Sequence, residues 1–231
     1  MPLQPIFICA LGGALLIPYI FLRCKGRLLT GLFIKAAISS LFMATAAASL
    51  FFGSAERSLL HIGILLGLLF GLFGDIFLDQ KDIYPQHKEP YMFAGFISFA
   101  VGHIFYLAGL YAAYGLTWGL LPATGIAALI GVGSIFASKP MRLEFGRFKA
   151  IVGAYGALLT FMVAACFAYY LKTKSPQAFM MGIGGVLFFL SDLVLSGTYF
   201  GEGKTRPIDY ALNYLLYYGA QFTIALSIAL D

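Results

Sequence analysis

The chain consists mostly of apolar segments, each close to the length that crosses a lipid bilayer as an α-helix. A spanning helix needs about 20 predominantly apolar residues. Hydrocarbon offers no water to backbone groups, so only helices and closed barrels can span it. We therefore expect an all-α, polytopic membrane helix bundle with eight transmembrane helices, forming a single transmembrane domain over residues 1–231. The eight segments are 5–22, 29–52, 59–78, 91–114, 116–136, 148–171, 177–198 and 208–230.

The composition excludes an ordinary soluble protein. Hydrophobic residues make up 61% of the chain and charged residues only 11%, whereas a soluble domain carries about 25% charged residues. The least distinct boundary lies between the fourth and fifth segments, which only Gly115 and its neighbours separate. Seven spans with one re-entrant segment are the alternative arrangement.

Lysine and arginine gather at the ends of alternate segments, and this bias indicates how a membrane protein is oriented. We expect both termini outside the cytoplasm, an integral protein of the bacterial plasma membrane, and no nucleic-acid partner behind the net charge of +5. In this orientation the inner connections carry Arg23, Lys25, Arg27, Lys81, Lys88, Lys139, Arg142, Arg147, Lys149, Lys204 and Arg206. The outer connections carry only Arg57, Lys172 and Lys174.

Two aspartates lie inside apolar segments. Asp75 lies in LFGLFGDIFL and Asp192 in GVLFFLSDLVLSG. A charged side chain at the centre of a bilayer costs roughly 2.5–3.5 kcal/mol or more, so such residues usually face the bundle interior and mark a functional site. Both acids fall near the predicted inner ends of their segments, which predicts one polar pocket reachable from the inner leaflet.

Other charged residues have two interpretations. Lys35, early in the second segment, either extends to the interface or pairs with one of the buried acids. Asp79 and Asp82 follow the third segment, and we expect them in a solvated loop. Glycines at four positions between 63 and 74 form a small-residue face that favours close helix packing.

Several neutral polar residues are candidates for the same pocket. His103 lies near the middle of the fourth segment, either bonded to a neighbouring helix or acting as an acid, a base or a headgroup contact. Asn213, Tyr217 and Gln221 are spaced by four and form one polar stripe on a helix. This stripe serves interhelical hydrogen bonding or lines the pocket, and Tyr155 is a further candidate.

No metal or other cofactor is expected. The three histidines lie at different predicted depths and cannot converge as zinc ligands. The three cysteines lack metal-binding or redox spacing, and no Gly-x-Ser-x-Gly or phosphate-loop motif occurs. The histidines are His61, His87 and His103.

Four motifs in order carry a family resemblance: GLFGDIFL, GFISFAVGHIFYLAG, GGVLFFLSDLVLSG and YYGAQ. Between about Lys35 and Gln221 the chain resembles the YhhN family of lysoplasmalogenase-like multipass membrane proteins. The resemblance implies eight helices and hydrolysis of the vinyl ether bond of a lysoplasmalogen, giving a fatty aldehyde and glycerophosphoethanolamine or glycerophosphocholine. By the same resemblance Asp75 and Asp192 take the family's two acidic positions. Lys35, His103, Tyr155 and Gln221 fall in matching contexts.

Vinyl ether hydrolysis suits a pair of carboxyl groups. The reaction begins with proton transfer to the enol-ether carbon, and water then adds to the resulting oxocarbenium ion. It therefore needs one protonated acid and one carboxylate that directs water. We hypothesise that Asp75 and Asp192 form this pair, that Lys35 keeps one of them ionised, and that the stripe of the last segment orients water or the glycerol.

Other function classes remain open. A proton-coupled lipid or small-molecule transporter or flippase could use the same acids. A structural membrane protein could use its polar groups for helix pairing alone, and a ceramidase-type metallohydrolase is a third alternative. The expected partners are a lysophospholipid substrate and membrane lipids, and the oligomeric state is left open.

Overall fold

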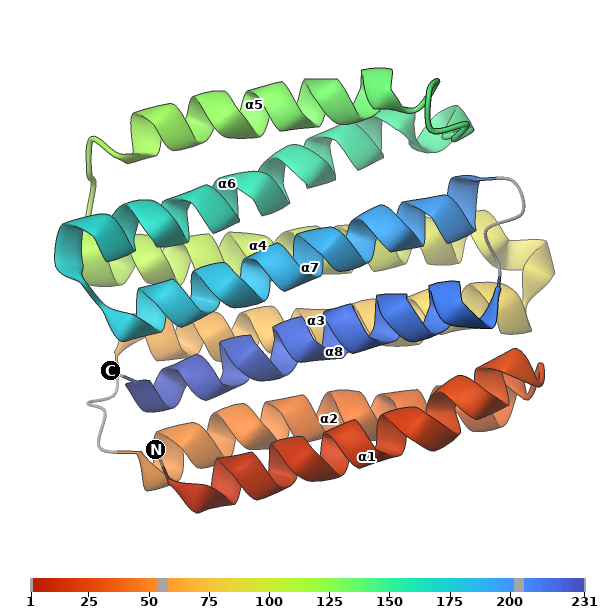
Figure 1. Cartoon of the computed structure of the whole chain (residues 1–231), viewed down its shortest axis with the longest axis horizontal. Helices are drawn as coiled ribbons and strands as arrows, with labels where there is room; N and C mark the ends of the chain where they lie inside the picture. Colours follow the sequence, from red (N-terminus) through yellow and green to blue (C-terminus); the bar gives the residue numbers. More distant parts are fainter. Residues whose placement is uncertain (1, 54–57, 202–205, 231) are drawn as a thin grey trace.

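A computed structural model describes residues 2–53, 58–201 and 206–230 of the chain. Its described residues form eight α-helices, which run side by side along the long axis of the molecule (Figure 1). The all-α prediction is confirmed. The helices are α1 (Leu3–Cys24), α2 (Leu28–Phe52), α3 (Leu59–Ile83), α4 (Lys88–Tyr114), α5 (Leu120–Ala137), α6 (Lys149–Thr173), α7 (Pro176–Phe200) and α8 (Pro207–Ser227). Short 3-10 helices cover Pro85–His87, Gly146–Phe148 and Ile228–Leu230.

Local sequence explains several helix ends. Ser175 begins α7, since its side chain accepts a hydrogen bond from the backbone N–H of Ala178, as an N-cap does. Proline follows at the first position of α7, and again at the first position of α8, where its missing N–H is not needed. Gly115 ends α4 with a φ of 68°, a conformation that glycine adopts without strain. The fourth and fifth predicted segments are therefore separate helices.

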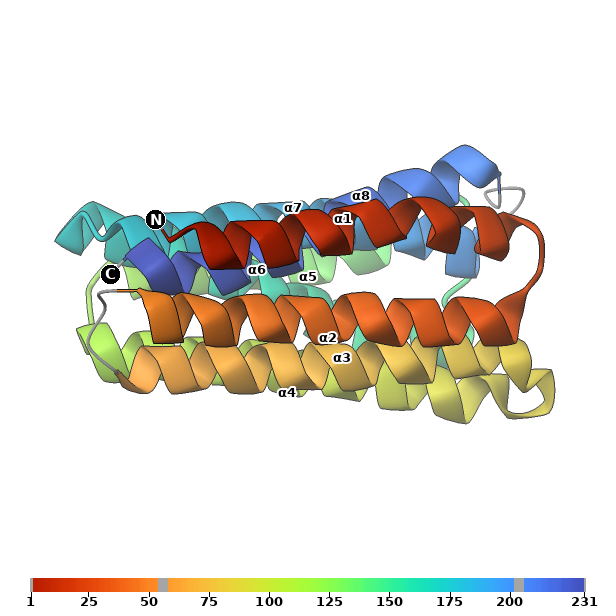
Figure 2. The same cartoon turned by 90° about the horizontal axis from the view of Figure 1, so that it is seen from below.

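Within the described part of the chain, six helices are long and apolar enough to cross a membrane: α1, α2, α3, α4, α6 and α7. This fits an integral membrane protein. Helix α5 is shorter, with an apolar part of Leu120–Phe136. Helix α8 lies against α1, α2, α3 and α7, and its buried side chains include the polar residues Asn213, Tyr217 and Gln221. Figure 2 shows α2, α3 and α4 along one side of the bundle and α1, α8 and α7 along the other.

The two chain termini lie at the same end of the bundle (Figure 1). The described basic residues of the predicted inner connections lie at the opposite end, while Lys172 and Lys174 lie near the termini. Arg57 and Lys204 fall outside the described residues. The predicted grouping of basic residues is thus present at one end of the molecule. Which side of a membrane that end faces stays a prediction.

Glycines on α3 allow α4 and α8 to pack closely against it. A Cβ at Gly63 would lie 2.6 Å from the backbone oxygen of Phe105 on α4. A Cβ at Gly71 would lie 2.5 Å from the side-chain nitrogen of Gln221 on α8. The small-residue face therefore permits the close helix approach predicted from the sequence.

Candidate functional site

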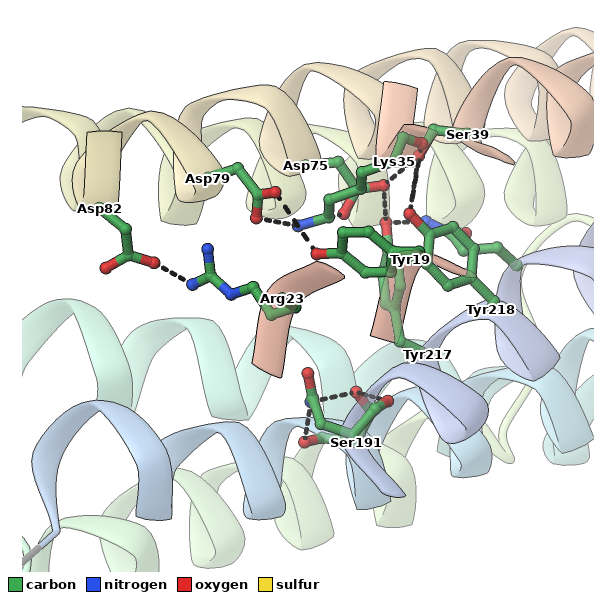
Figure 3. A network of polar contacts seen from close by, with 12 residues as sticks. Tyr19, Arg23, Lys35, Ser39, Asp75, Asp79, Asp82, Ser191, Tyr217 and Tyr218 are labelled. Carbon is green, nitrogen blue, oxygen red and sulfur yellow. Dashed lines mark hydrogen bonds and ion pairs between the residues drawn. The ribbon is translucent and has the colours of Figure 1, made fainter. Parts of the chain in front are cut away.

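Asp75 lies where three helices meet (Figure 3). Its carboxyl accepts a hydrogen bond of 2.6 Å from the hydroxyl of Ser39 on α2 and one of 2.8 Å from the phenol of Tyr217 on α8. The ammonium of Lys35, also on α2, lies 3.4 Å from the other carboxyl oxygen. The side chain of Asp75 is 3% exposed. A buried carboxylate with a cation and two hydroxyl donors is well compensated for its loss of water.

Lys35 turns into the bundle interior and pairs with acids there. Its side chain is buried, and its ammonium donates a 2.8 Å hydrogen bond to Asp79 as well as lying near Asp75. The phenol of Tyr19 on α1 donates to the second carboxyl oxygen of Asp79 at 3.4 Å. Of the two interpretations of Lys35, the structure therefore shows pairing with buried acids.

The expectation that Asp79 and Asp82 lie in a solvated loop is wrong. Helix α3 continues to Ile83, so Asp79 lies in the helix and is buried, while Asp82 lies in its last turn. Asp82 forms ion pairs with Arg23 and Lys81. The overlooked signal was spacing, because Asp79 is four residues after Asp75 and such residues share one face of a helix.

Asp192 has a different environment on α7. Its carboxyl accepts a 2.7 Å hydrogen bond from the phenol of Tyr155 on α6. Among the residues that the structure describes, no lysine or arginine forms an ion pair with Asp192. The two predicted acids are thus unlike: Asp75 belongs to a charged cluster and Asp192 is held by a neutral phenol.

Both acids border one small polar cavity. It has a volume of about 30 Å³, and its lining also includes Lys35, Tyr217 and Asn213. A water molecule needs roughly 10–15 Å³ of such space, so this cavity, which both aspartates border, has room for water. Asp75 on α3 and Asp192 on α7 thus line one cavity, as predicted, while its access from the inner leaflet stays a prediction.

Asp192 also borders a larger apolar cavity. This cavity, of about 320 Å³, lies between α5, α6 and α7 and includes Tyr155, Ile130 and Phe189 in its lining. Ile130 and Phe189 also line an apolar groove of about 720 Å³ farther along the same helices. We call these two spaces together the apolar groove. Asp192 thus lies between a water-sized polar cavity and a space suited to a hydrocarbon chain.

The residues of the polar stripe on α8 make two separate sets of hydrogen bonds, one around Asp75 and one to Ser191 on α7. Gln221 donates to the phenol oxygen of Tyr217 at 2.9 Å and accepts from Tyr106 at 3.4 Å, which extends the network around Asp75. Asn213 instead donates to the backbone oxygen and the hydroxyl of Ser191, both at 2.9 Å. The first pair therefore orients Asp75, and Asn213 attaches α8 to α7 beside Asp192.

His103 does not form the interhelical hydrogen bond that one interpretation predicted. Its Nδ1 lies 2.7 Å from the backbone oxygen of Phe99 on the same helix, so this nitrogen donates its hydrogen. Its Nε2 is buried without a hydrogen-bond partner among the described residues. The ring contacts Tyr155 and Phe188 edge-on, with centroids 5.7 and 5.0 Å away. His103 therefore packs against Tyr155, the residue that donates a hydrogen bond to Asp192.

No group of three or more His, Cys, Asp or Glu side chains gathers in a metal-binding arrangement within the described ranges. The site consists of carboxyl groups, one lysine, phenols and amides held inside a bundle of apolar helices. This combination defines a polytopic α-helical membrane protein with a buried acidic site. The chain belongs to the YhhN family, whose model matches residues 30–228. No curated protein and no solved structure matched the chain.

Proposed function

We propose that the protein is a membrane hydrolase that cleaves the vinyl ether bond of lysoplasmalogen-type lysophospholipids. The products are a fatty aldehyde and a glycerophospho-headgroup. The observation that carries this proposal is that Asp75 and Asp192 border one water-sized cavity but have unlike partners. Membership of the YhhN family is consistent with a membrane enzyme and supports the proposal.

In this proposal all eight helices cross the membrane. Helices α5 and α8 run alongside the six long apolar helices (Figure 1). Large apolar side chains of α5 are exposed, including Leu121, Leu129 and Phe136, as expected where lipid replaces water. We propose the bacterial plasma membrane as the location, with both termini outside the cytoplasm.

The unlike environments assign the two roles. An uncompensated charge beside an apolar cavity is costly. Asp192, which has no cationic partner among the described residues, therefore acts as the neutral carboxylic acid. Asp75 acts as the carboxylate because Lys35, Ser39 and Tyr217 all stabilise negative charge on it. Two carboxyl groups in different environments commonly divide into acid and base in this way.

The first step uses the proton of Asp192. The π electrons of the vinyl group form a C–H bond at the carbon remote from oxygen, which leaves an oxocarbenium ion and the Asp192 carboxylate. That carboxylate lies beside the new positive charge and stabilises it. The lipid's hydrocarbon chain lies in the apolar groove that Asp192 borders.

The second step uses water held between the acids. Asp75 removes a proton from the water as its oxygen bonds to the oxocarbenium carbon, giving a hemiacetal. Asp192 then takes the hemiacetal hydroxyl proton, and Asp75 protonates the departing glycerol oxygen. The C–O bond breaks to give aldehyde and alcohol, and both aspartates return to their starting forms with one water consumed.

Purified protein and two lipids test this function. A lysoplasmalogen should yield aldehyde, and an ester-linked lysophospholipid of equal chain length should yield nothing. Asp192→Asn and Asp75→Asn should each remove most turnover, while Glu144→Gln, a change at an exposed carboxyl, should not. Absence of aldehyde with the native protein, or full turnover by either folded Asp→Asn variant, would refute the proposal.

A proton-coupled transporter or flippase is the second candidate. The cluster of Lys35 with Asp75 and Asp79 favours it, because buried ionisable groups in membrane helices often relay protons. Lipid movement in sealed vesicles without formation of aldehyde would select this function over hydrolysis.

A further inference from the structure

A third cavity, separate from the apolar groove, lies at the end of the bundle opposite the termini. It has a volume of about 340 Å³ and lies where the α1–α2 and α3–α4 connections meet the ends of α7 and α8. We call it the basic pocket. It is lined by Arg23, Leu28, Lys81, Asp82, Lys88, Thr198, Tyr199 and Tyr210.

The basic pocket holds more positive than negative charge. Arg23 and Lys81 both pair with Asp82, and their side chains are only 9% and 5% exposed. Lys88 is exposed and adds a third cation to the lining. The ammonium of Lys81 also lies 4.3 Å from the ring centroid of Tyr199. Among the described lining residues one carboxylate, Asp82, accompanies the buried cations Arg23 and Lys81 and the exposed Lys88. A cleft whose lining carries mainly one sign of charge attracts ions of the opposite sign, so this lining suits an anion.

Tyr199 connects this pocket to the acids. It lines the basic pocket, the small cavity of Asp75 and Asp192, and the part of the apolar groove that Asp192 borders. Asp192 and Tyr199 are seven residues apart on α7, as are Asp75 and Asp82 on α3. Seven residues make two helical turns, or about 10 Å along the axis. The three spaces thus adjoin at Tyr199, and a path from the groove past Asp192 to Asp82 meets them in the order apolar, acidic and basic.

This order matches the parts of a single-chain glycerophospholipid. Its hydrocarbon chain is followed by the bond at the first glycerol carbon, then by the rest of the glycerol, then by the phosphate. Phosphate oxygens accept charge-assisted hydrogen bonds from lysine and arginine. With the chain in the apolar groove and the cleaved bond at the acids, the phosphate comes to the cations.

We propose that the basic pocket binds the phosphate group of a single-chain glycerophospholipid, with Lys81 and Lys88 contacting its oxygens. This inference rests on the proposed function for the identity of the lipid. Asp82 positions Lys81 through an ion pair, and Arg23 in turn pairs with Asp82. An amine beyond the phosphate extends past exposed Lys88 toward water.

Binding of uncleavable ligands tests the site independently of catalysis. The ligands are a saturated 1-alkyl-glycero-3-phosphocholine and a 1-alkyl-glycerol of the same chain length, titrated against the full-length protein in detergent by native mass spectrometry. The native protein should bind the phosphate-bearing ether about tenfold more tightly. Lys88→Gln and Lys81→Gln should each remove much of this preference and leave alkyl-glycerol binding unchanged. Lys149→Gln, at an exposed lysine of α6 outside the pocket, should change neither.

Inorganic phosphate and glycerol 3-phosphate distinguish the possible sources of the phosphate. If they bind in a Lys88-dependent manner as tightly as the lipid, the pocket serves soluble phosphates and the lipid assignment is overturned. If Lys88→Gln weakens both alkyl ligands equally, or neither, the phosphate site itself is overturned. Because Lys81 is buried, a poorly folded Lys81→Gln leaves the decision to Lys88→Gln and to the charge-reversed Lys88→Glu. Absence of aldehyde formation by the native protein, by contrast, would refute only the proposed reaction and leave the phosphate site standing.

Discussion

Lys35 lies closer to Asp79 than to Asp75, with its ammonium 2.8 Å from the first and 3.4 Å from the second carboxyl group. One cation therefore serves two carboxylates that are one turn apart on α3. Asp79 accepts the hydrogen bond of the lysine, and Asp75 lines the small cavity. This division makes Asp79 a positioning residue for the proposed carboxylate.

Replacing Lys35 should damage both the fold and the reaction. In Lys35→Met two buried carboxylates lose their cation, and breaking such a buried pair costs about 3–5 kcal/mol. Thermal unfolding in detergent should show a lower midpoint, with aldehyde formation lost. A double variant, Lys35→Met with Asp79→Asn, should regain part of the stability because one uncompensated charge is removed. If the double variant is less stable than the single one, this account of the cluster is wrong.

Asp79→Asn should affect activity less than Asp75→Asn. The amide of the variant still accepts a hydrogen bond from Lys35, and Asp75 still borders the cavity. We expect about a 10-fold or smaller loss of turnover, against a loss of about 10²–10⁴-fold for removal of a general acid–base group. Rates for the two variants, compared at equal folded fraction, check this order. Equal losses would show that Asp79 takes part directly.

Tyr155→Phe should lower turnover without unfolding the protein. The change removes the 2.7 Å hydrogen bond to Asp192, and such a bond contributes about 0.5–1.5 kcal/mol. Turnover should fall roughly 3- to 10-fold, while the ring still packs against His103. Tyr111→Phe is the matched control, since Tyr111 is an exposed tyrosine on α4. Unchanged turnover in Tyr155→Phe would remove Tyr155 from the site.

Gly133→Leu should discriminate between lipids by chain length. Gly133 lines the apolar groove on α5, and a Cβ placed there meets no atom within 4 Å. The leucine should occupy groove volume, raise KM for long-chain substrate and leave short-chain substrate unaffected. Gly125→Leu, also on α5 with open space at its Cβ and outside the groove lining, is the control. A similar effect of both variants would place the hydrocarbon chain elsewhere.

In D₂O the aldehyde should carry one solvent deuterium at the carbon next to the carbonyl. The proposed first step places the Asp192 proton on that carbon, and this proton exchanges with solvent between turnovers. Mass spectrometry of aldehyde trapped at once as a hydrazone measures the label. Unlabelled aldehyde would mean that cleavage does not begin with protonation of the double bond.

The helices, and the position of Asp75 and Asp192 at an interior cavity, could be predicted because the sequence features that indicate them are local. Segment length indicates the helices, and an aspartate amid phenylalanine and leucine indicates a buried site wherever the helix packs. The position of Asp79 could not be predicted in this way, because charged residues at the end of an apolar run suggest a loop. Its burial depends on the ion pair with Lys35, which lies on another helix. The α3–α8 approach that brings Gln221 to Asp75 depends on which helices become neighbours.

The basic pocket could not be predicted by reading along the chain. Arg23, Lys81 and Lys88 each lie near a helix end, where the positive-inside bias already explains a basic residue. Their meeting with Tyr199 depends on the packing of α1, α3, α4 and α7. The hydrogen bond of His103 could not be predicted along the chain either. A histidine inside an apolar segment suggests a partner on another helix, but the acceptor is the backbone oxygen of Phe99, one turn earlier on α4.

Tyr199 stands where the three spaces meet, and this arrangement bears on how cleaved halves would depart. The apolar groove runs among helices whose outer residues, such as Leu129, are 74% exposed, while the basic pocket reaches exposed Lys88. In the proposed reaction the aldehyde would leave sideways into the bilayer, and the polar fragment would diffuse out at the rim. The two products would then have separate exits, so that release of one would not depend on release of the other.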